Sequence, residues 1–212
     1  MEIKKIVAGG SAADPPHLGH VVLLTHLLES RLFDRVIWIL SGNRNDKQYS
    51  VTPDDRVAMT ELCVGGLRTK RNLKPTHTEL IIRYTDVYYE NTPTMQCIRN
   101  LRAEFPGAEI TWYTGSDSVT PRFNGKCEIE AKWGEGKELM KEKFLILPRE
   151  DYKLSNELPP NFEIFNTTLP NISSTEIRER IQDGRTISHL VIPDVEEYIK
   201  THQLYIQQSD EV

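Results

Sequence analysis

Segments with the composition of β-strands alternate with segments of helical periodicity along this chain, and this alternation constrains the fold most strongly. Parallel strands need helical crossovers, so the alternation predicts an α/β fold with a mostly parallel sheet and helices on both faces. The expected strands cover residues 3–8, 35–40, 79–84, 109–113, 144–147 and 162–165. The expected helices cover residues 16–29, 53–64, 93–104, 136–143, 173–182 and 194–202.

Length and composition predict one domain, residues 1–212, in a reducing compartment. A chain of 212 residues with 38% apolar content can bury a sizeable core. The formal net charge of −5 excludes the general basic field by which proteins attract nucleic acid. Cys63, Cys97 and Cys127 are too far apart for a disulfide framework or a zinc site, which indicates the cytoplasm. No uncharged apolar run approaches 18 residues, so we expect a soluble protein without a membrane partner.

Two histidines stand where the first expected strand gives way to a helix, in GGSAADPPHLGH, residues 9–20. Ligands of open parallel sheets bind beyond the carboxyl ends of the strands. There, Gly9 and Gly10 would let the backbone approach a ligand, and the first helical amides would be unpaired donors. His17 and His20, three residues apart, would share the first turn and add two donors. Helical histidines can also serve packing alone, but this glycine and proline context favours a phosphate site.

A second candidate phosphate site lies in NISSTEIRERIQDG near the end of the chain. Ser173 and Glu176 form a capping box, so Ser174 and Thr175 lie at a helix N-terminus with Arg178 one turn along. A well-capped amphipathic helix explains the same residues structurally. Three hydroxyls and an arginine at a dipole end also describe a phosphate clamp.

Other common phosphate and metal motifs are absent from the sequence. It contains no GxxxxGK[ST] loop and no GxGxxG after a strand. The remaining histidines lack HExxH spacing, so we expect no dedicated metal site.

The two candidate sites together resemble a known superfamily. Residues 9–20 resemble the GGSFDPPHxGH signature of the HxGH nucleotidyltransferases, and residues 172–178, ISSTEIR, resemble their ISSTxIR signature. The likeness covers nearly the whole chain and is closest to nicotinate mononucleotide adenylyltransferases. It is supported by the segments Gly115-Ser116-Asp117, FLILPR and ISHLVIPDVEEYIKTHQLY. The chain departs from the signature at Ala12-Ala13, where the family has a single phenylalanine.

The resemblance implies a Rossmann-like sheet, with a C-terminal helical part at residues 170–206 that carries ISSTxIR. It further implies an enzyme of NAD biosynthesis that transfers AMP from ATP to nicotinate mononucleotide and releases pyrophosphate, with Mg²⁺ on the triphosphate. The resemblance is compatible with a homo-oligomer but does not fix the oligomeric state.

The resemblance also implies roles for individual residues, which are assigned by their positions in the matching motifs. The catalytic residues implied are His17, His20 and Arg178. The ATP-binding residues implied are Gly9, Gly10, Ser11, Lys47, Gly115, Asp117, Ser173, Ser174 and Thr175. The residues implied to receive the nicotinate ring are Thr94, Met95 and Trp133. Lys47 is equally well explained as a solvated loop charge.

The expected chemistry needs no general base, because the phosphate of the mononucleotide is already ionised near pH 7 and attacks the α-phosphorus in line. Three alternatives stay open at this point. One is a sister transferase acting on nicotinamide mononucleotide, phosphopantetheine, FMN or a cytidylyl substrate. Another is a noncatalytic adenylate-binding sensor, suggested by Ala12-Ala13. The third is a hydrolase that passes AMP to water, for which the sequence offers no activating base.

Overall fold

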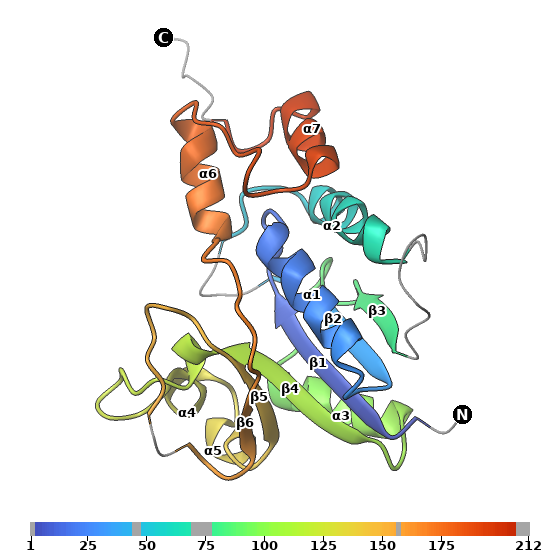
Figure 1. Ribbon diagram of the computed structural model, residues 1–212, viewed down its shortest axis with the longest axis vertical. Helices are drawn as coiled ribbons and strands as arrows, with labels where there is room; N and C mark the ends of the chain where they lie inside the picture. The colour runs from blue at the N-terminus through green and yellow to red at the C-terminus, as the bar shows by residue number, and fades with distance from the viewer. Residues whose placement is uncertain (1–2, 44–47, 69–77, 156–157, 207–212) are drawn as a thin grey trace.

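The computed structural model describes residues 3–43, 48–68, 78–155 and 158–206, and its framework is one six-stranded parallel sheet (Figure 1). The strand order is β3-β2-β1-β4-β5-β6, and every neighbouring pair is parallel. This is the order of a doubly wound Rossmann-like sheet. The strands are β1 (Lys5–Ser11), β2 (Arg35–Leu40), β3 (Glu79–Arg83), β4 (Glu109–Gly115), β5 (Lys143–Leu147) and β6 (Phe162–Ile164).

The helices connect the strands and close the chain. They are α1 (Leu18–Ser30), α2 (Pro53–Arg68), α3 (Thr94–Glu104), α4 (Glu128–Lys132), α5 (Gly136–Leu139), α6 (Ser174–Gln182) and α7 (Pro193–Thr201). A 3₁₀ turn, Ser116–Ser118, follows β4. The predicted alternation of strands and helices is therefore confirmed.

Helices cover both faces of the sheet, because successive strand residues point to opposite sides. On one face, Val7 of β1 packs with apolar side chains of α1 and α2. On the other, Ile6 and Ala8 pack with side chains of α3, α4 and α5. The sheet is thus the middle of three layers.

The C-terminal helical part has an apolar cluster of its own. Ile177 of α6 and Val195 of α7 pack with Met59 and Cys63 of α2. Figure 1 shows α2, α6 and α7 together at one end of the molecule. The packing of this cluster fixes the position of the start of α6 relative to the sheet.

Several element boundaries differ from those that the sequence predicts. The pattern favours a helix start at Pro16, whereas α1 begins at Leu18 because His17 has an extended backbone, with φ −148° and ψ 173°. Pro193 is the first residue of α7 rather than its predecessor, as suits a residue without a backbone N–H. Helix α4 is not among the predicted elements, because its five residues are too few to show a helical period.

Two further sequence expectations concern the cysteines and the membrane. Cys63, Cys97 and Cys127 are all free and buried. Among the described helices, none combines the length and apolar character needed to cross a membrane.

The strand order places a topological switch point between β1 and β4. These strands are neighbours, with Lys5 opposite Glu109 and Ala8 opposite Trp112. The chain leaves β1 toward one edge of the sheet and β4 toward the other, and ligands of such sheets bind beyond the carboxyl ends of the strands at this point. The segments after β1 and β4 carry many of the predicted ATP-binding residues.

Candidate active site

The two histidines lie at the start of α1, directly after the loop that follows β1. His17 is the N-cap and His20 is the third helical residue. The backbone N–H of His17 donates to Nδ1 of His20 over 3.2 Å, and the ring centroids are 3.9 Å apart. The structure therefore brings the pair together at the helix start, as predicted.

Fewer amides are free at this helix start than the sequence suggests. The Leu18 amide donates to the Leu190 carbonyl over 2.9 Å, and the His20 amide donates to the His17 carbonyl over 2.9 Å. Within the described residues, this leaves the Gly19 amide as the backbone donor of the first turn without a carbonyl partner. The imidazoles therefore supply much of the hydrogen-bonding capacity of this site.

Both imidazoles are neutral at pH 7. Burial, followed by the positive charge of Arg149, lowers the pKa of His17 from 6.5 to about 4. Burial, His17 and Arg149, in that order, lower the pKa of His20 well below 6.5. Because Nδ1 of neutral His20 accepts a hydrogen bond, its proton lies on Nε2, which is left to donate to a ligand. Nδ1 of His17 is buried and has no hydrogen-bond partner in the described part of the chain.

The end of β1 supports this arrangement through packing. The ring of His20 stacks on Trp38 of β2, with centroids 4.9 Å apart, and the Trp38 indole N–H donates to Oγ of Ser11 over 2.9 Å. A Cβ on Gly9 would lie 2.3 Å from the ring of Tyr113, and one on Gly10 would lie 3.4 Å from a β2 carbonyl. The structure thus gives Gly9 a packing role in addition to the predicted approach to a ligand.

The first turn of α6 docks on the loop before α1. Ser173 caps α6 by accepting the Glu176 amide over 3.1 Å. Oγ of Ser174 donates to the Pro15 carbonyl over 2.8 Å. Nη1 of Arg178 donates to the Asp14 carbonyl over 2.7 Å, and Nη2 donates to Oγ1 of Thr175 over 3.3 Å. The two signature segments therefore meet in space, although more than 150 residues separate them.

A third group converges from β4 and β5. Nε of Arg149, just after β5, lies 3.2 Å from Oδ1 of Asp117, just after β4. The Arg149 amide donates to Oγ of buried Ser116 over 2.9 Å. A Cβ on Gly115 would lie 2.2 Å from the Asp117 carboxylate and 2.6 Å from the Arg149 guanidinium. A side chain at position 115 would therefore displace this ion pair at the end of β4.

The predicted ring-binding residues gather at the start of α3. Met95 is buried in the sheet-facing cluster against which Trp133 packs, and Gly134 lies against Pro93. The sequence favours Thr92 as the cap of the helix expected over residues 93–104, but this prediction is wrong, because the Thr92 amide and hydroxyl donate to the Asp86 carboxylate over 2.9 and 3.0 Å. Pro93 is the N-cap, and no side chain caps α3. Within the part of the chain that the structure describes, the first amides of α3 thus have no side-chain acceptor.

A comparison with known protein families identifies the family of this chain. The model of the family described as cytidylyltransferase-like matches residues 7–180, which include both signature segments. The chain belongs to this family.

Two curated relatives align with nearly the whole chain. A protein of Synechococcus sp. strain JA-2-3B'a(2-13), named probable nicotinate-nucleotide adenylyltransferase, is 27% identical over 98% of this chain and 100% of its own length. One of Thermus thermophilus with the same name is 29% identical over 92% of this chain and 96% of its own. These relatives place the chain among the nucleotidyltransferases.

A solved structure shares the fold. Plasmodium falciparum nicotinic acid mononucleotide adenylyltransferase complexed with NaAD superposes with a TM-score of 0.79 at 21% identity, covering 95% of this chain and 97% of the other. The Rossmann-like architecture implied by the sequence is therefore confirmed.

The departure from the family signature, Ala12-Ala13, is accommodated by a residue that the sequence analysis misses. Nε of Arg56 donates to the Ala12 carbonyl over 2.8 Å, and Nη2 donates to the Ser41 carbonyl. Arg56 is 1% exposed, and its guanidinium lies 3.9 Å from the centroid of the Tyr49 ring. Ala13 is buried with a φ of 48°. Arg56 and Tyr49 thus stabilise this longer loop. The sequence feature that could have pointed to Arg56 is an arginine within the helix expected over residues 53–64.

Arg149 is the second residue missing from the predicted site, although its segment supports the resemblance. Its position just after the carboxyl end of an expected strand was the signal that the sequence offered. Lys47, in contrast, lies outside the described residues.

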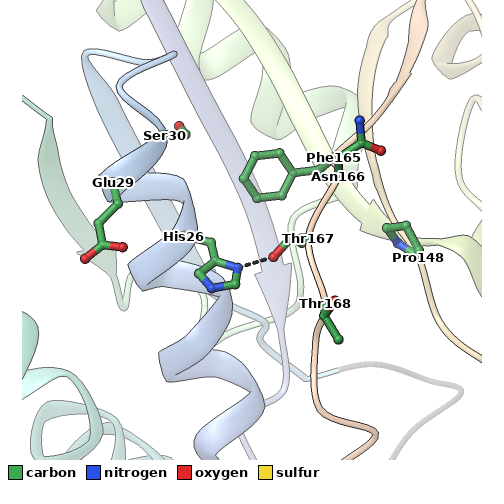
Figure 2. Close-up of a pocket in the computed structure, with 8 residues that line it drawn as sticks. All are labelled: His26, Glu29, Ser30, Pro148, Phe165, Asn166, Thr167 and Thr168. Atoms are coloured by element: carbon green, nitrogen blue, oxygen red, sulfur yellow. Dashed lines mark hydrogen bonds between the residues drawn. The ribbon is translucent and has the colours of Figure 1, made fainter.

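A separate groove of about 770 Å³ lies between α1 and the segment that follows β6. Figure 2 shows His26 pointing from α1 to the hydroxyl of Thr167, with which it makes a hydrogen bond. The rest of the lining comprises Glu29, Ser30, Pro148, Phe165, Asn166 and Thr168. The His26 contact ties α1 to the segment that leads into α6.

The described residues include no group of three or more His, Cys, Asp or Glu side chains arranged to hold a metal ion. Mg²⁺ bound through phosphate oxygens and waters needs no such cage.

Proposed function

We propose that this protein transfers AMP from ATP to nicotinate mononucleotide, forming the dinucleotide and pyrophosphate in the cytoplasm. The observation that carries the proposal is the docking of Arg178 on the loop that leads into the His17–His20 pair. The names of the two curated relatives support the choice of substrate.

In this reaction, an oxygen of the mononucleotide phosphate attacks the α-phosphorus of ATP, and the bond to the bridging oxygen of the β-phosphate breaks. Phosphoryl-type transfer depends on positioning and charge stabilisation more than on covalent help from the protein. Neutral His20 donates from Nε2 to oxygens that gain charge as pyrophosphate leaves. Neither histidine acts as the base, because the attacking phosphate is already ionised.

The remaining site residues bind ATP and orient it. Mg²⁺, held mainly by the phosphate oxygens of ATP and by water, would neutralise part of the triphosphate charge. Arg178 grips the phosphates from the α6 side, and Ser11, Ser173, Ser174 and Thr175 contribute their hydroxyls. Asp117, which the resemblance assigns to ATP binding, forms an ion pair with Arg149, and this pair orients the adenosine ribose.

The start of α3 receives the nicotinate carboxylate. The amides of Thr94 and Met95 belong to a helix start without a side-chain cap and without an acidic residue in its first turn. Such a helix end favours an anion. Trp133 packs against the same cluster as Met95 and offers a ring to the pyridine.

A substrate panel tests the proposal with purified protein, ATP and Mg²⁺, following pyrophosphate release. The panel contains nicotinate mononucleotide, nicotinamide mononucleotide, FMN and phosphopantetheine, with CTP exchanged for ATP in a parallel series. We expect the highest kcat/KM with nicotinate mononucleotide. ATP binding without turnover on any acceptor would instead identify a sensor, and AMP release without an acceptor would identify a hydrolase.

A further inference from the structure

Asp14, in the loop between β1 and α1, joins three parts of the chain that are distant in sequence. Its side chain is 1% exposed. Oδ1 accepts the hydroxyl of Tyr205 over 2.9 Å, and Oδ2 accepts the Ser50 amide over 3.1 Å. Its backbone carbonyl accepts Nη1 of Arg178 over 2.7 Å. The Asp14 side chain is therefore held by the C-terminal segment. The Asp14 backbone in turn binds Arg178 of the candidate phosphate site.

Tyr205 reaches Asp14 through an unusual backbone path after α7. Gln203 and Tyr205 have φ values of 52° and 66°, in the left-handed region that non-glycine residues rarely adopt. Tyr205 is nevertheless 8% exposed and packs in the cluster formed by α2, α6 and α7. Such backbone conformations persist only where the surrounding structure determines them. Here the burial of the Tyr205 ring and its hydrogen bond to Asp14 hold the backbone in this conformation.

The environment of Asp14 explains why one hydroxyl matters. A buried carboxylate needs donors, because burial removes the water that would otherwise solvate it. Tyr205 supplies a side-chain donor to Oδ1, and Ser50 supplies a backbone donor to Oδ2. Without the hydroxyl, Oδ1 loses this donor, and the present orientation of the carboxylate is no longer stabilised on that side. Where the Asp14 backbone adjusts to a turn of the carboxylate, the carbonyl that accepts the Arg178 guanidinium shifts with it.

We propose that Tyr205 is a positioning residue for the adenylyl-transfer site: through the Asp14 carboxylate, its hydroxyl fixes the carbonyl that orients the Arg178 guanidinium toward the ATP phosphates. The inference rests on the proposed function, because it gives Arg178 the ATP phosphates as its target. It assigns to the end of the chain a role in the reaction as well as in packing.

The Tyr205→Phe variant tests the inference, since it removes the hydroxyl and keeps the buried ring. We expect kcat/KM for ATP to fall by at least about tenfold, because a small misplacement of a phosphate-binding group is costly. We expect KM for nicotinate mononucleotide to stay within about twofold, since the start of α3 lies outside this network.

Tyr198→Phe is the matched control. The Tyr198 hydroxyl also donates to a carboxylate, Oδ1 of Asp55 in α2, over 3.1 Å, but Asp55 does not belong to the loop between β1 and α1. Both variants lose one tyrosine–carboxylate hydrogen bond between the C-terminal part and the rest of the chain. A purely structural role for Tyr205 predicts a loss of thermal stability in Tyr205→Phe and unchanged ATP kinetics in both variants.

A double-mutant cycle with Arg178→Lys separates action through Arg178 from an independent effect. If Tyr205 acts through the guanidinium, Tyr205→Phe changes kcat/KM for ATP by less than about twofold in the Arg178→Lys background. Full additivity overturns the inference, as does a Tyr205→Phe variant that keeps the ATP kinetics of the unaltered protein.

Calorimetric titration with α,β-methylene ATP distinguishes failure of this inference from failure of the proposed function. If the unaltered protein transfers AMP to no mononucleotide, the proposed function fails, but the affinity for this analogue still tests the role of Tyr205. We expect Tyr205→Phe to weaken binding at least about tenfold and Tyr198→Phe to leave it unchanged. Equal affinities of Tyr205→Phe and the unaltered protein, or no binding by the latter, overturn the inference.

Discussion

The imidazole of His17 lies against the Cα atom of Gly19. A Cβ at position 19 would approach both Cε1 and Nδ1 of that ring to 2.9 Å, closer than a real Cβ contact allows. The glycine of the HLGH motif is therefore the residue that lets the His17 ring fold back over the first turn of α1. Its role is steric rather than conformational.

Gly19→Ala should displace the His17 ring and lower turnover by at least about tenfold, because the ring would no longer aim at the phosphate site. Gly66→Ala is the control: it lies in α2, where a new Cβ has nothing within 4 Å. Steady-state kinetics and thermal unfolding of both variants provide the measurement. If Gly19→Ala retains full turnover, the observed position of the His17 ring is not the working one.

His20→Ala, and separately His17→Ala, should lower turnover by about 10²-fold or more, since each removes a donor to oxygens that gain charge in the transition state. The control is His26→Ala, on the same helix, where the imidazole contacts Thr167 instead. Pyrophosphate release under saturating substrates measures the effect. Near-normal rates in both site variants would remove the histidines from the mechanism.

The pH dependence of stability should carry a contribution from His17. Its pKa falls from 6.5 to about 4 on folding, chiefly because burial disfavours the imidazolium. Between these pH values the unfolded chain binds a proton that the folded chain does not, so stability decreases as the pH falls from about 6.5 to 4. The decrease from this group amounts to at most about 3 kcal/mol.

His17→Gln should therefore reduce the loss of stability between pH 7 and pH 4.5. Urea unfolding at the two pH values gives the free energy of unfolding of each form. His189→Gln, a change at an exposed position, serves as the comparison. An equal loss in the unaltered protein and in His17→Gln would show that His17 is protonated in the folded state without penalty.

Local features of this fold could be predicted from the sequence because they depend on neighbouring residues. The expected strand 109–113 lies within β4, and the Ser173 cap of α6 is present as predicted. Strand alternation and capping act over a few residues, so a pattern is enough to detect them.

The contacts between distant segments could not be predicted in the same way. The docking of Arg178 on the Asp14 carbonyl and of Arg56 on the Ala12 carbonyl depend on how α6 and α2 pack. Both use a backbone acceptor, which carries no residue-type signal. The sequence therefore indicates that Arg178 belongs to the site, but not that it also supports the loop before α1.

Arg178→Lys should lower turnover and raise KM for ATP together. The planar guanidinium donates to the Asp14 carbonyl and to Thr175 at once, whereas an ammonium group cannot keep both contacts and also form a two-pronged phosphate contact. Arg180→Lys is the matched control, because Arg180 lies on the same helix and donates to a different carbonyl, that of Thr186. Unaltered ATP kinetics in Arg178→Lys would assign Arg178 to loop support alone.

The acid form of the mononucleotide should be preferred over the amide form, because of how α3 begins. Its first amides have no side-chain cap, and its first turn contains no acidic residue, so the positive end of the helix dipole is left to a ligand. A carboxylate gains charge-assisted hydrogen bonds there, whereas a carboxamide directs its own NH₂ donors toward N–H groups. The difference should be on the order of 1–3 kcal/mol, or roughly 5-fold to 150-fold in kcat/KM.

Thr94→Pro sharpens this last test, because it removes one of these amide donors at a helical position that tolerates proline. The preceding Pro93 already has an extended backbone, with φ −57° and ψ 143°, which suits a residue before proline. We expect the ratio of kcat/KM for nicotinate and nicotinamide mononucleotides to fall in Thr94→Pro and to stay unchanged in Thr94→Ala, which keeps the amide. Equal specificity constants for the two substrates in the unaltered protein would mean that the ring substituent is recognised away from the start of α3.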